Sequence, residues 1–277
     1  MEHRVTSIAD APSLTHDSDE LAADYDRVSA TRQLLSGKRL VEDLVIEPGE
    51  RVLDIGCGTG LLAEHISSLV GPAGRVLGID PLPLRIELAK TRARADCLAF
   101  QVGDAYDLGV LPETSFDVVV INAVFHWLPE KTGPLRGCAR LLRPGGRIGI
   151  STNLKGNITD VHRLMAESMA EPPFDRYPFN RKSVTYRVDA AEMRALFEAT
   201  GFLPTLVEER PTEQRYPSPE AVVSYSEASS FGNLFAHLPD ALKPAARVAM
   251  ARRLAVINSS HGIIQRGRRL VAVATRR

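Results

Sequence analysis

A short apolar segment that ends in closely spaced glycines constrains the fold of this chain more than any other feature. Residues 51–60 read Arg-Val-Leu-Asp-Ile-Gly-Cys-Gly-Thr-Gly. Val52, Leu53 and Ile55 predict a buried strand, and the glycines allow a sharp turn and a close approach to a ligand. Residues 61–66 then predict a helix whose first amides point into the same crevice. Strand, glycine turn and helix together indicate a nucleotide-cofactor loop.

The composition is that of an ordinary soluble globular chain. Among 277 residues, 34 basic side chains balance 34 acidic ones, which gives no electrostatic footprint for nucleic acid. No apolar stretch is long enough to cross a bilayer, and the N-terminus lacks a signal-peptide core. Cys57, Cys97 and Cys138 lie too far apart for a zinc site or a disulfide framework. We therefore expect a cytoplasmic protein with no metal and with neither a membrane nor a nucleic-acid partner, and the sequence leaves open a homo-oligomer.

Strand and helix patterns alternate along the chain and predict a doubly wound, mostly parallel α/β sheet. Short apolar runs predict strands at 51–55, 75–79, 98–102, 116–122 and 146–151. Amphipathic stretches predict helices near 60–69, 82–94 and 131–142. Two further strands, at 202–209 and 269–275, bring the sheet to seven.

The remaining segments form an N-terminal part and two insertions, all within one compact domain. Residues 1–45 predict a helical segment that closes over the cofactor site, with two helices broken near Ser36 and Gly37. Residues 46–152 form the cofactor-binding core. Within 153–277, residues 153–188 are expected to be irregular and 217–260 mostly helical. These insertions follow the fifth and sixth strands, where a substrate cap belongs.

The glycine spacing distinguishes between nucleotide cofactors. A dinucleotide-binding G-x-G-x-x-G places two residues between its second and third glycines, whereas one residue separates Gly58 from Gly60. Asp54 precedes the turn, where a carboxylate can accept a charge-assisted hydrogen bond from an ammonium group. Both features count against NAD and disfavour an NAD-linked oxidoreductase.

Residues 52–60 resemble motif I of the class I S-adenosylmethionine (SAM)-dependent methyltransferases. Four later segments resemble landmarks of that family in the same order: 76–80, 101–106, 116–122 and 141–146. The resemblance covers roughly residues 25–152 and implies a Rossmann-like methyltransferase fold with SAM as the cofactor. It is strongest with the group that contains ubiquinone/menaquinone-type and natural-product methyltransferases.

The resemblance also implies which residues contact SAM. Asp54 would bind the ammonium group, Asp80 the ribose hydroxyls and Asp104 the adenine amino group. Capping of the chain's own amides is the alternative for each aspartate, and Trp127 could equally pack in the core. The full expected set is Asp54, Gly56, Cys57, Gly58, Gly60, Asp80, Pro81, Leu82, Asp104, Ala105, Asn122 and Trp127.

Two residues are candidate catalytic groups. His126 follows the fourth strand, and histidine is suited to removing a proton from an acceptor. Tyr25 resembles the aromatic residue that closes over SAM in related small-molecule methyltransferases, and its hydroxyl could orient the acceptor or bond the methionine end. Packing is the alternative role for both residues.

The predicted acceptor is a small apolar or aromatic metabolite, with O- or C-methylation favoured. The fourth strand ends in Asn122-Ala-Val-Phe125, unlike the [Asp/Asn]-Pro-Pro-[Tyr/Phe] tetrad of enzymes that methylate bases or glutamine. Aromatic residues in the insertions could enclose the acceptor or form the insertions' own core: Phe174, Tyr177, Phe179, Tyr225, Phe231 and Phe235.

Two further expectations concern charge and turnover. The cluster Arg266, Arg268 and Arg269 is typical of solvated strand ends more than of a phosphate patch. The alternative function is a SAM-binding protein without turnover that acts as a sensor or interaction module.

Overall fold

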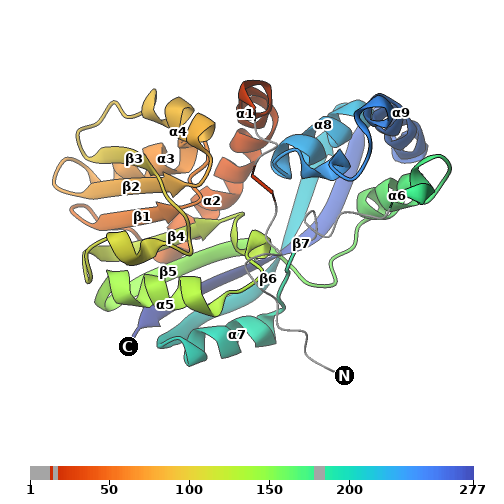
Figure 1. The fold of residues 1–277 in the computed structure, drawn as a ribbon. Coiled ribbons are helices and arrows are strands. Elements are labelled where there is room, and N and C mark those ends of the chain that lie inside the picture. The colour runs from red at the N-terminus through yellow and green to blue at the C-terminus, as the bar shows by residue number, and fades with distance from the viewer. Residues whose placement is uncertain (1–12, 15–17, 178–184) are drawn as a thin grey trace.

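The computed structural model describes residues 13–14, 18–177 and 185–277, and its centre is one seven-stranded sheet. The strand order is β3-β2-β1-β4-β5-β7-β6, and only β7 runs antiparallel to its neighbours (Figure 1). The predicted fold class is confirmed. The strands are β1 (Arg51–Ile55), β2 (Arg75–Asp80), β3 (Leu98–Val102), β4 (Phe116–Asn122), β5 (Leu142–Asn153), β6 (Phe202–Tyr216) and β7 (Ile263–Arg276).

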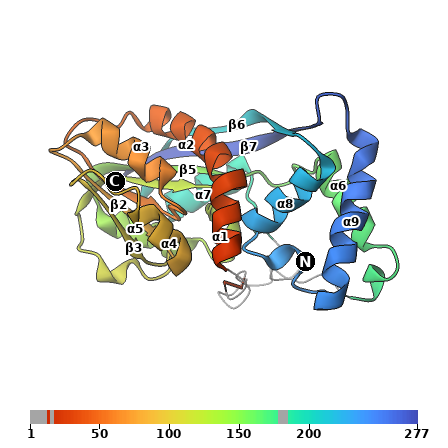
Figure 2. The same ribbon diagram turned by 90° about the horizontal axis from the view of Figure 1, so that it is seen from above.

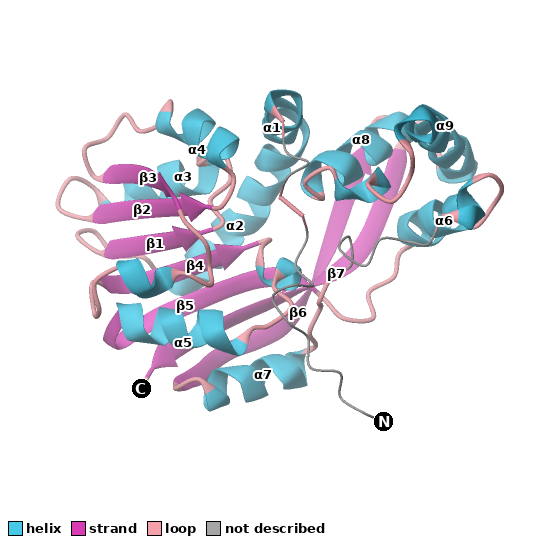
Figure 3. Cartoon of the chain, in the orientation of Figure 1, coloured by secondary structure: helices cyan, strands magenta, loops and turns pink. Residues whose placement is uncertain are grey.

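Helices cover both faces of the sheet, as expected for buried parallel strands (Figure 3). In β4, Val118 and Val120 contribute to one core cluster, whereas Val119 and Ile121 contribute to the other. All four side chains are fully buried, which explains their unbroken apolar run. The first face packs against α2 (Thr31–Leu44), α3 (Leu61–Val70) and α4 (Pro83–Lys90), and the second against α5 (Thr132–Leu141) and α7 (Ala190–Ala199).

The N-terminal segment is helical without the expected break. Helix α1 (Asp19–Tyr25) continues through a π-helical turn, Asp26–Ala30, into α2. Gly37 lies inside α2, where a Cβ atom would stand 2.6 Å from Cδ2 of Leu62. The prediction of a break was wrong because this glycine allows close helix packing and does not end the helix. Figure 2 shows α1 between the sheet and a second helical layer.

That second layer rests on the long antiparallel pair of strands β6 and β7. We call this pair the hairpin, although residues 217–262 connect its two strands. The two strands pair from Phe202 with Arg276 to Tyr216 with Ile263, whereas β5 pairs with β7 only as far as Asn153 with Arg269. The outer halves therefore project beyond the rest of the sheet (Figure 1). The sequence predicted shorter strands because these outer halves are largely polar and are stabilised by each other.

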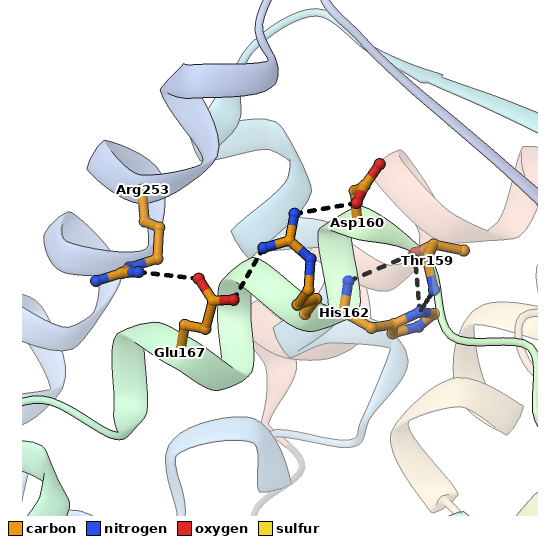
Figure 4. Close-up of polar contacts among 6 residues, drawn as sticks. Thr159, Asp160, His162, Glu167 and Arg253 are labelled. Carbon is orange, nitrogen blue, oxygen red and sulfur yellow. Dashed lines mark hydrogen bonds and ion pairs between the residues drawn. The ribbon is translucent and has the colours of Figure 1, made fainter.

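Helices α6 (Asp160–Met169), α8 (Pro219–Ser229) and α9 (Lys243–Leu254) pack on this hairpin and share a core that includes Phe174 and Phe235. Helix α6 corrects the expectation that 153–188 is irregular. A capping box starts it: the Thr159 amide donates to Nδ1 of His162 at 3.2 Å, and the His162 amide donates to the Thr159 hydroxyl at 3.4 Å. Arg253 of α9 bonds Glu167 of α6 at 2.9 Å (Figure 4).

Substitution of Gly37 tests the close packing of α2. We expect Gly37→Val to lower the free energy of unfolding by about 1–3 kcal/mol, because the added atoms overlap Leu62. The matched control is Arg39→Val, on an exposed position of the same helix, which should cost less than about 1 kcal/mol. Urea unfolding followed by circular dichroism measures both, and equal losses would contradict the packing argument.

Candidate functional site

The turn after β1 is bonded to the end of β2. The amides of Gly56 and Cys57 both donate to the carbonyl of Ile79, at 2.7 and 3.0 Å. Gly56 has a φ of +74°, and a Cβ atom there would stand 2.1 Å from Cγ2 of Val124. No side chain fits at this position, so glycine is required for both its conformation and its space.

Asp80 fixes the same turn from the other side. Its carboxylate accepts the amide of Gly58 at 2.9 Å and the amide of Leu82 at 3.0 Å. Gly60 begins α3 and lies against Phe100. Gly58, Gly60 and Leu82 therefore shape the turn, and none of these three lines a cavity described below.

Two cavities open at the carboxyl ends of the strands. The strand-end cavity is lined by Gly56, Asp80, Pro81, Asp104, Ala105 and Trp127, together with Tyr25, Arg85, Tyr106 and Phe231. The loop cavity is lined by Asp54, Gly56, Cys57, Thr59 and Asn122, together with Tyr25 and Gln33. The structure thus brings nine of the twelve expected cofactor residues to two adjoining cavities.

Two buried oxygen atoms at the loop cavity have no hydrogen-bond partner among the described residues. They are Oδ2 of Asp54 and Oδ1 of Asn122. The amide nitrogen of Asn122 donates to the carbonyl of Gln33 at 2.9 Å, which leaves its oxygen as an acceptor. Buried acceptors without donors are costly, so this cavity suits a ligand that brings donors.

The carboxyl group of Asp54 is perturbed by its surroundings. Burial, and secondly the nearby charge of Asp80, raise its pKa from 3.8 to about 7. A positively charged donor in the loop cavity would stabilise the ionised form and lower this pKa again.

A third cavity, the hairpin cavity, lies against the projecting parts of β6 and β7. It measures about 250 Å³, and its wall includes His126, Trp127, Tyr216, Tyr225, Leu234 and Arg269. Gln33, Ala123, Trp127 and Ser229 line both this cavity and the strand-end cavity. Gln33 also lines the loop cavity, so the three cavities meet at its side chain.

Tyr25 and Gln33 form a hydrogen-bonded pair at this meeting point. The Tyr25 hydroxyl donates to Oε1 of Gln33 at 2.5 Å, and the guanidinium of Arg85 lies 3.8 Å over the Tyr25 ring. Burial raises the pKa of the Tyr25 phenol, so it stays protonated and acts as a donor. Gln33 was not among the residues predicted from the sequence, although a glutamine on the buried side of an amphipathic helix was an available signal.

His126 is buried at the wall of the hairpin cavity. Its Nδ1 lies 3.1 Å from the hydroxyl of Thr152. Burial, and then the charges of Arg269, Arg187 and Lys131, hold its pKa well below the usual range, so the ring is neutral at neutral pH. Lys131 fixes the turn that carries His126, because its ammonium group donates to the carbonyls of Phe125 and Leu128 at 2.9 and 2.6 Å.

The aromatic residues of the insertions divide between core and cavity. Phe174 and Phe235 belong to the insertions' own core, and Tyr177 packs against it. Phe231 lies edge-on to Trp127, with 5.1 Å between ring centroids, and lines the strand-end cavity. Tyr225 lines the hairpin cavity, and Phe179 lies outside the described residues.

Comparison with known proteins agrees with this geometry. Residues 53–150 match the family model described as "Methyltransferase domain". The chain is 36% identical over 106 residues to a "Ubiquinone biosynthesis O-methyltransferase" of Xanthomonas oryzae pv. oryzae, a match that covers 38% of this chain and 43% of that protein. A longer match is 30% identical to a "Malonyl-[acyl-carrier protein] O-methyltransferase" of Methylococcus capsulatus and covers 79% of this chain and 76% of that protein.

Solved structures share the fold. The YcgJ protein of Bacillus subtilis superposes with a TM-score of 0.58 at 18% identity, over 87% of this chain and 98% of that one. The chain belongs to the class I SAM-dependent methyltransferases, and SAM is the cofactor of this family. It spans less than half of the length of the Xanthomonas relative. No helix in the described ranges is long and apolar enough to cross a membrane.

Replacement of Asp54 tests its perturbed carboxyl group in the ligand-free protein. The folded-state pKa lies above the unfolded value, so the wild type loses stability as the pH rises from about 4 through about 7. Relative to that of Asp54→Asn, the free energy of unfolding of the wild type should fall by up to about 1.4 kcal/mol for each pH unit in this window. Urea unfolding of both proteins across this range measures the difference, and parallel pH curves would contradict it.

Proposed function

We propose that this chain transfers the methyl group of SAM to a small molecule bound in the hairpin cavity. One observation carries the proposal: the hairpin cavity adjoins the strand-end cavity at Gln33, Ala123 and Trp127, and it adjoins the loop cavity at Gln33. A methyl donor in those cavities and an acceptor in the hairpin cavity would then meet at one place. The relatives from Xanthomonas and Methylococcus, both named as O-methyltransferases, support the reaction class.

The residues of the loop cavity fit the methionine end of SAM. Asp54 and Asn122 each offer a buried acceptor without a partner among the described residues, and an ammonium group has three donors. In the strand-end cavity, Asp80 would bind the ribose hydroxyls, and Asp104 and Ala105 would contact the adenine. SAM supplies a methyl group on a positively charged sulfur, which is a good leaving group.

The chain's main tasks are alignment and exclusion of water. Tyr25 holds the amide of Gln33 where the cavities meet, so that Gln33 can orient the acceptor. Trp127 forms a wall between donor and acceptor. His126 is neutral and reaches the hairpin cavity, so it can take a proton from an acceptor oxygen or carbon. O- or C-methylation of a molecule with an apolar or aromatic body fits a wall containing Trp127, Tyr225 and Leu234.

Binding measurements test the role of Asp54. We expect Asp54→Asn to weaken binding of S-adenosylhomocysteine at least about ten-fold at pH 8, because a charge-assisted hydrogen bond is lost. In the wild type, affinity should rise as Asp54 ionises toward a pH of about 7 and then level, whereas the variant should show a flat profile. Calorimetry measures both, with Glu64→Gln on α3 as a control. Equal affinity of the variant and the wild type for S-adenosylhomocysteine would show that Asp54 does not contribute to binding.

Incubation with methyl-labelled SAM and fractionated small molecules tests turnover. A labelled small-molecule product is expected, and His126→Ala should lower its rate at least about ten-fold without a comparable loss of SAM affinity. Unchanged turnover in that variant would contradict a catalytic role of His126 and leave packing as its role. Tight SAM binding with no labelled product across the fractions would favour the alternative, a SAM-binding protein without turnover.

A further inference from the structure

The charged side chains that line the hairpin cavity have one sign. They are Arg187, Arg268 and Arg269, and no aspartate or glutamate lines the cavity in the described part of the chain. Arg268 is mostly exposed and pairs with Glu209 at 2.9 Å. Within the same described ranges, neither Arg187 nor Arg269 forms an ion pair with a carboxylate. Two guanidinium groups without a counter-charge therefore face one cavity.

Neutral groups hold both guanidinium groups in place. Arg269 donates from Nε to the Ser151 hydroxyl at 2.7 Å and from Nη2 to the Ser151 carbonyl at 3.1 Å. Arg187 donates from Nε to the Thr185 hydroxyl at 2.9 Å and from Nη1 to the Asn157 carbonyl at 3.1 Å. One terminal nitrogen of each arginine has no protein partner among the described residues. A fixed guanidinium with a spare donor matches carboxylate geometry.

The pKa shifts of Arg187 and Arg269 agree with two guanidinium groups that lack a counter-charge. Burial lowers the pKa of both guanidinium groups, and in the described part of the chain only Tyr225, beside Arg269, acts against this effect. Arginine nevertheless stays protonated in proteins, so both charges persist. Burying a charge without a partner is costly, and an anion that enters with a ligand would offset that cost.

We propose that Arg187 and Arg269 bind a carboxylate of the methyl acceptor, so that the substrates are small organic acids. That this acid is the methyl acceptor rests on the proposed function, whereas the anion site rests on the residues of the cavity alone. The apolar and aromatic part of the lining, with Trp127, Tyr225 and Leu234, would contact the apolar or aromatic body of the acid. The expectation of a solvated strand end is thus wrong for Arg269, whose side chain turns into the cavity while Arg266 and Arg268 remain exposed.

Matched acids and amides test the anion site. The probes are benzoate, 4-hydroxybenzoate and cinnamate, each paired with its primary amide, added to the protein saturated with S-adenosylhomocysteine. Trp127 is the only tryptophan, so its fluorescence reports occupancy of the cavity that it lines. At least one acid should bind about ten-fold or more tightly than its amide.

The variants are Arg187→Gln and Arg269→Gln, with Arg269→Lys as a charge-retaining substitution. Arg266→Gln is the matched control, because it removes the same charge from β7 outside the cavity. In both glutamine variants the preference for the acid should fall to within about two-fold, whereas Arg269→Lys should keep part of it and the control all of it. Binding of S-adenosylhomocysteine should be unchanged throughout, which shows that the variants are folded.

Two results would overturn the anion site: no acid binding more tightly than its amide in the wild type, or a preference that survives in both glutamine variants. Methyl transfer separates this proposal from the proposed function. If the protein binds the acids more tightly than the amides but methylates nothing, the anion site is supported and the proposed enzymatic function is contradicted. A protein that methylates an acid and its neutral amide at equal rates, in the wild type and in both glutamine variants, supports the proposed function and contradicts the anion site.

Discussion

The carboxylate of Asp80 joins the ends of the neighbouring strands β1 and β2, and the rest of the site depends on this contact. It receives the amides of Gly58 and Leu82, while the neighbouring carbonyl of Ile79 receives those of Gly56 and Cys57. The turn after β1 is thereby held by β2, which sets where α3 and α4 begin. A Cβ atom at Gly58 would stand 3.0 Å from the Tyr25 hydroxyl, so this turn also lets the N-terminal helix approach.

This arrangement has an electrostatic cost. Asp80 and Asp54 are both buried at the strand ends, and burial together with the charge of Asp80 disfavours the ionised form of Asp54. The raised pKa of Asp54 reflects the cost of ionising this carboxyl group in the ligand-free protein. A cation in the loop cavity would relieve it, so the binding energy of a positively charged cofactor offsets a strain that the fold itself maintains.

The sequence predicts the parts of the site whose signals are local. Asp54 and Asp80 lie in the last residues of β1 and β2, and Asp104 follows β3; parallel strands bring their carboxyl ends to one edge. Gln33 and Arg187 carry no such signal, because a hairpin and helices distant in sequence place them. Two local signals were available and were not used: Thr159 as a helix cap, and the alternation that exposes Arg268 but turns Arg269 inward.

Charge is therefore largely separated within a chain of zero net charge. Among the described residues, aspartates line the strand-end and loop cavities together with Arg85, whereas three arginines and no carboxylate line the hairpin cavity. This separation bears on which atom of an acid would be methylated. A carboxylate loses its negative charge when its oxygen accepts a methyl group, so arginines bound to that oxygen would stabilise the ground state more than the transition state. Arg187 and Arg269 are better suited to anchoring an acid by a group remote from the reacting atom. Under the proposed function, the reacting oxygen or carbon would then lie near Gln33, where the three cavities meet.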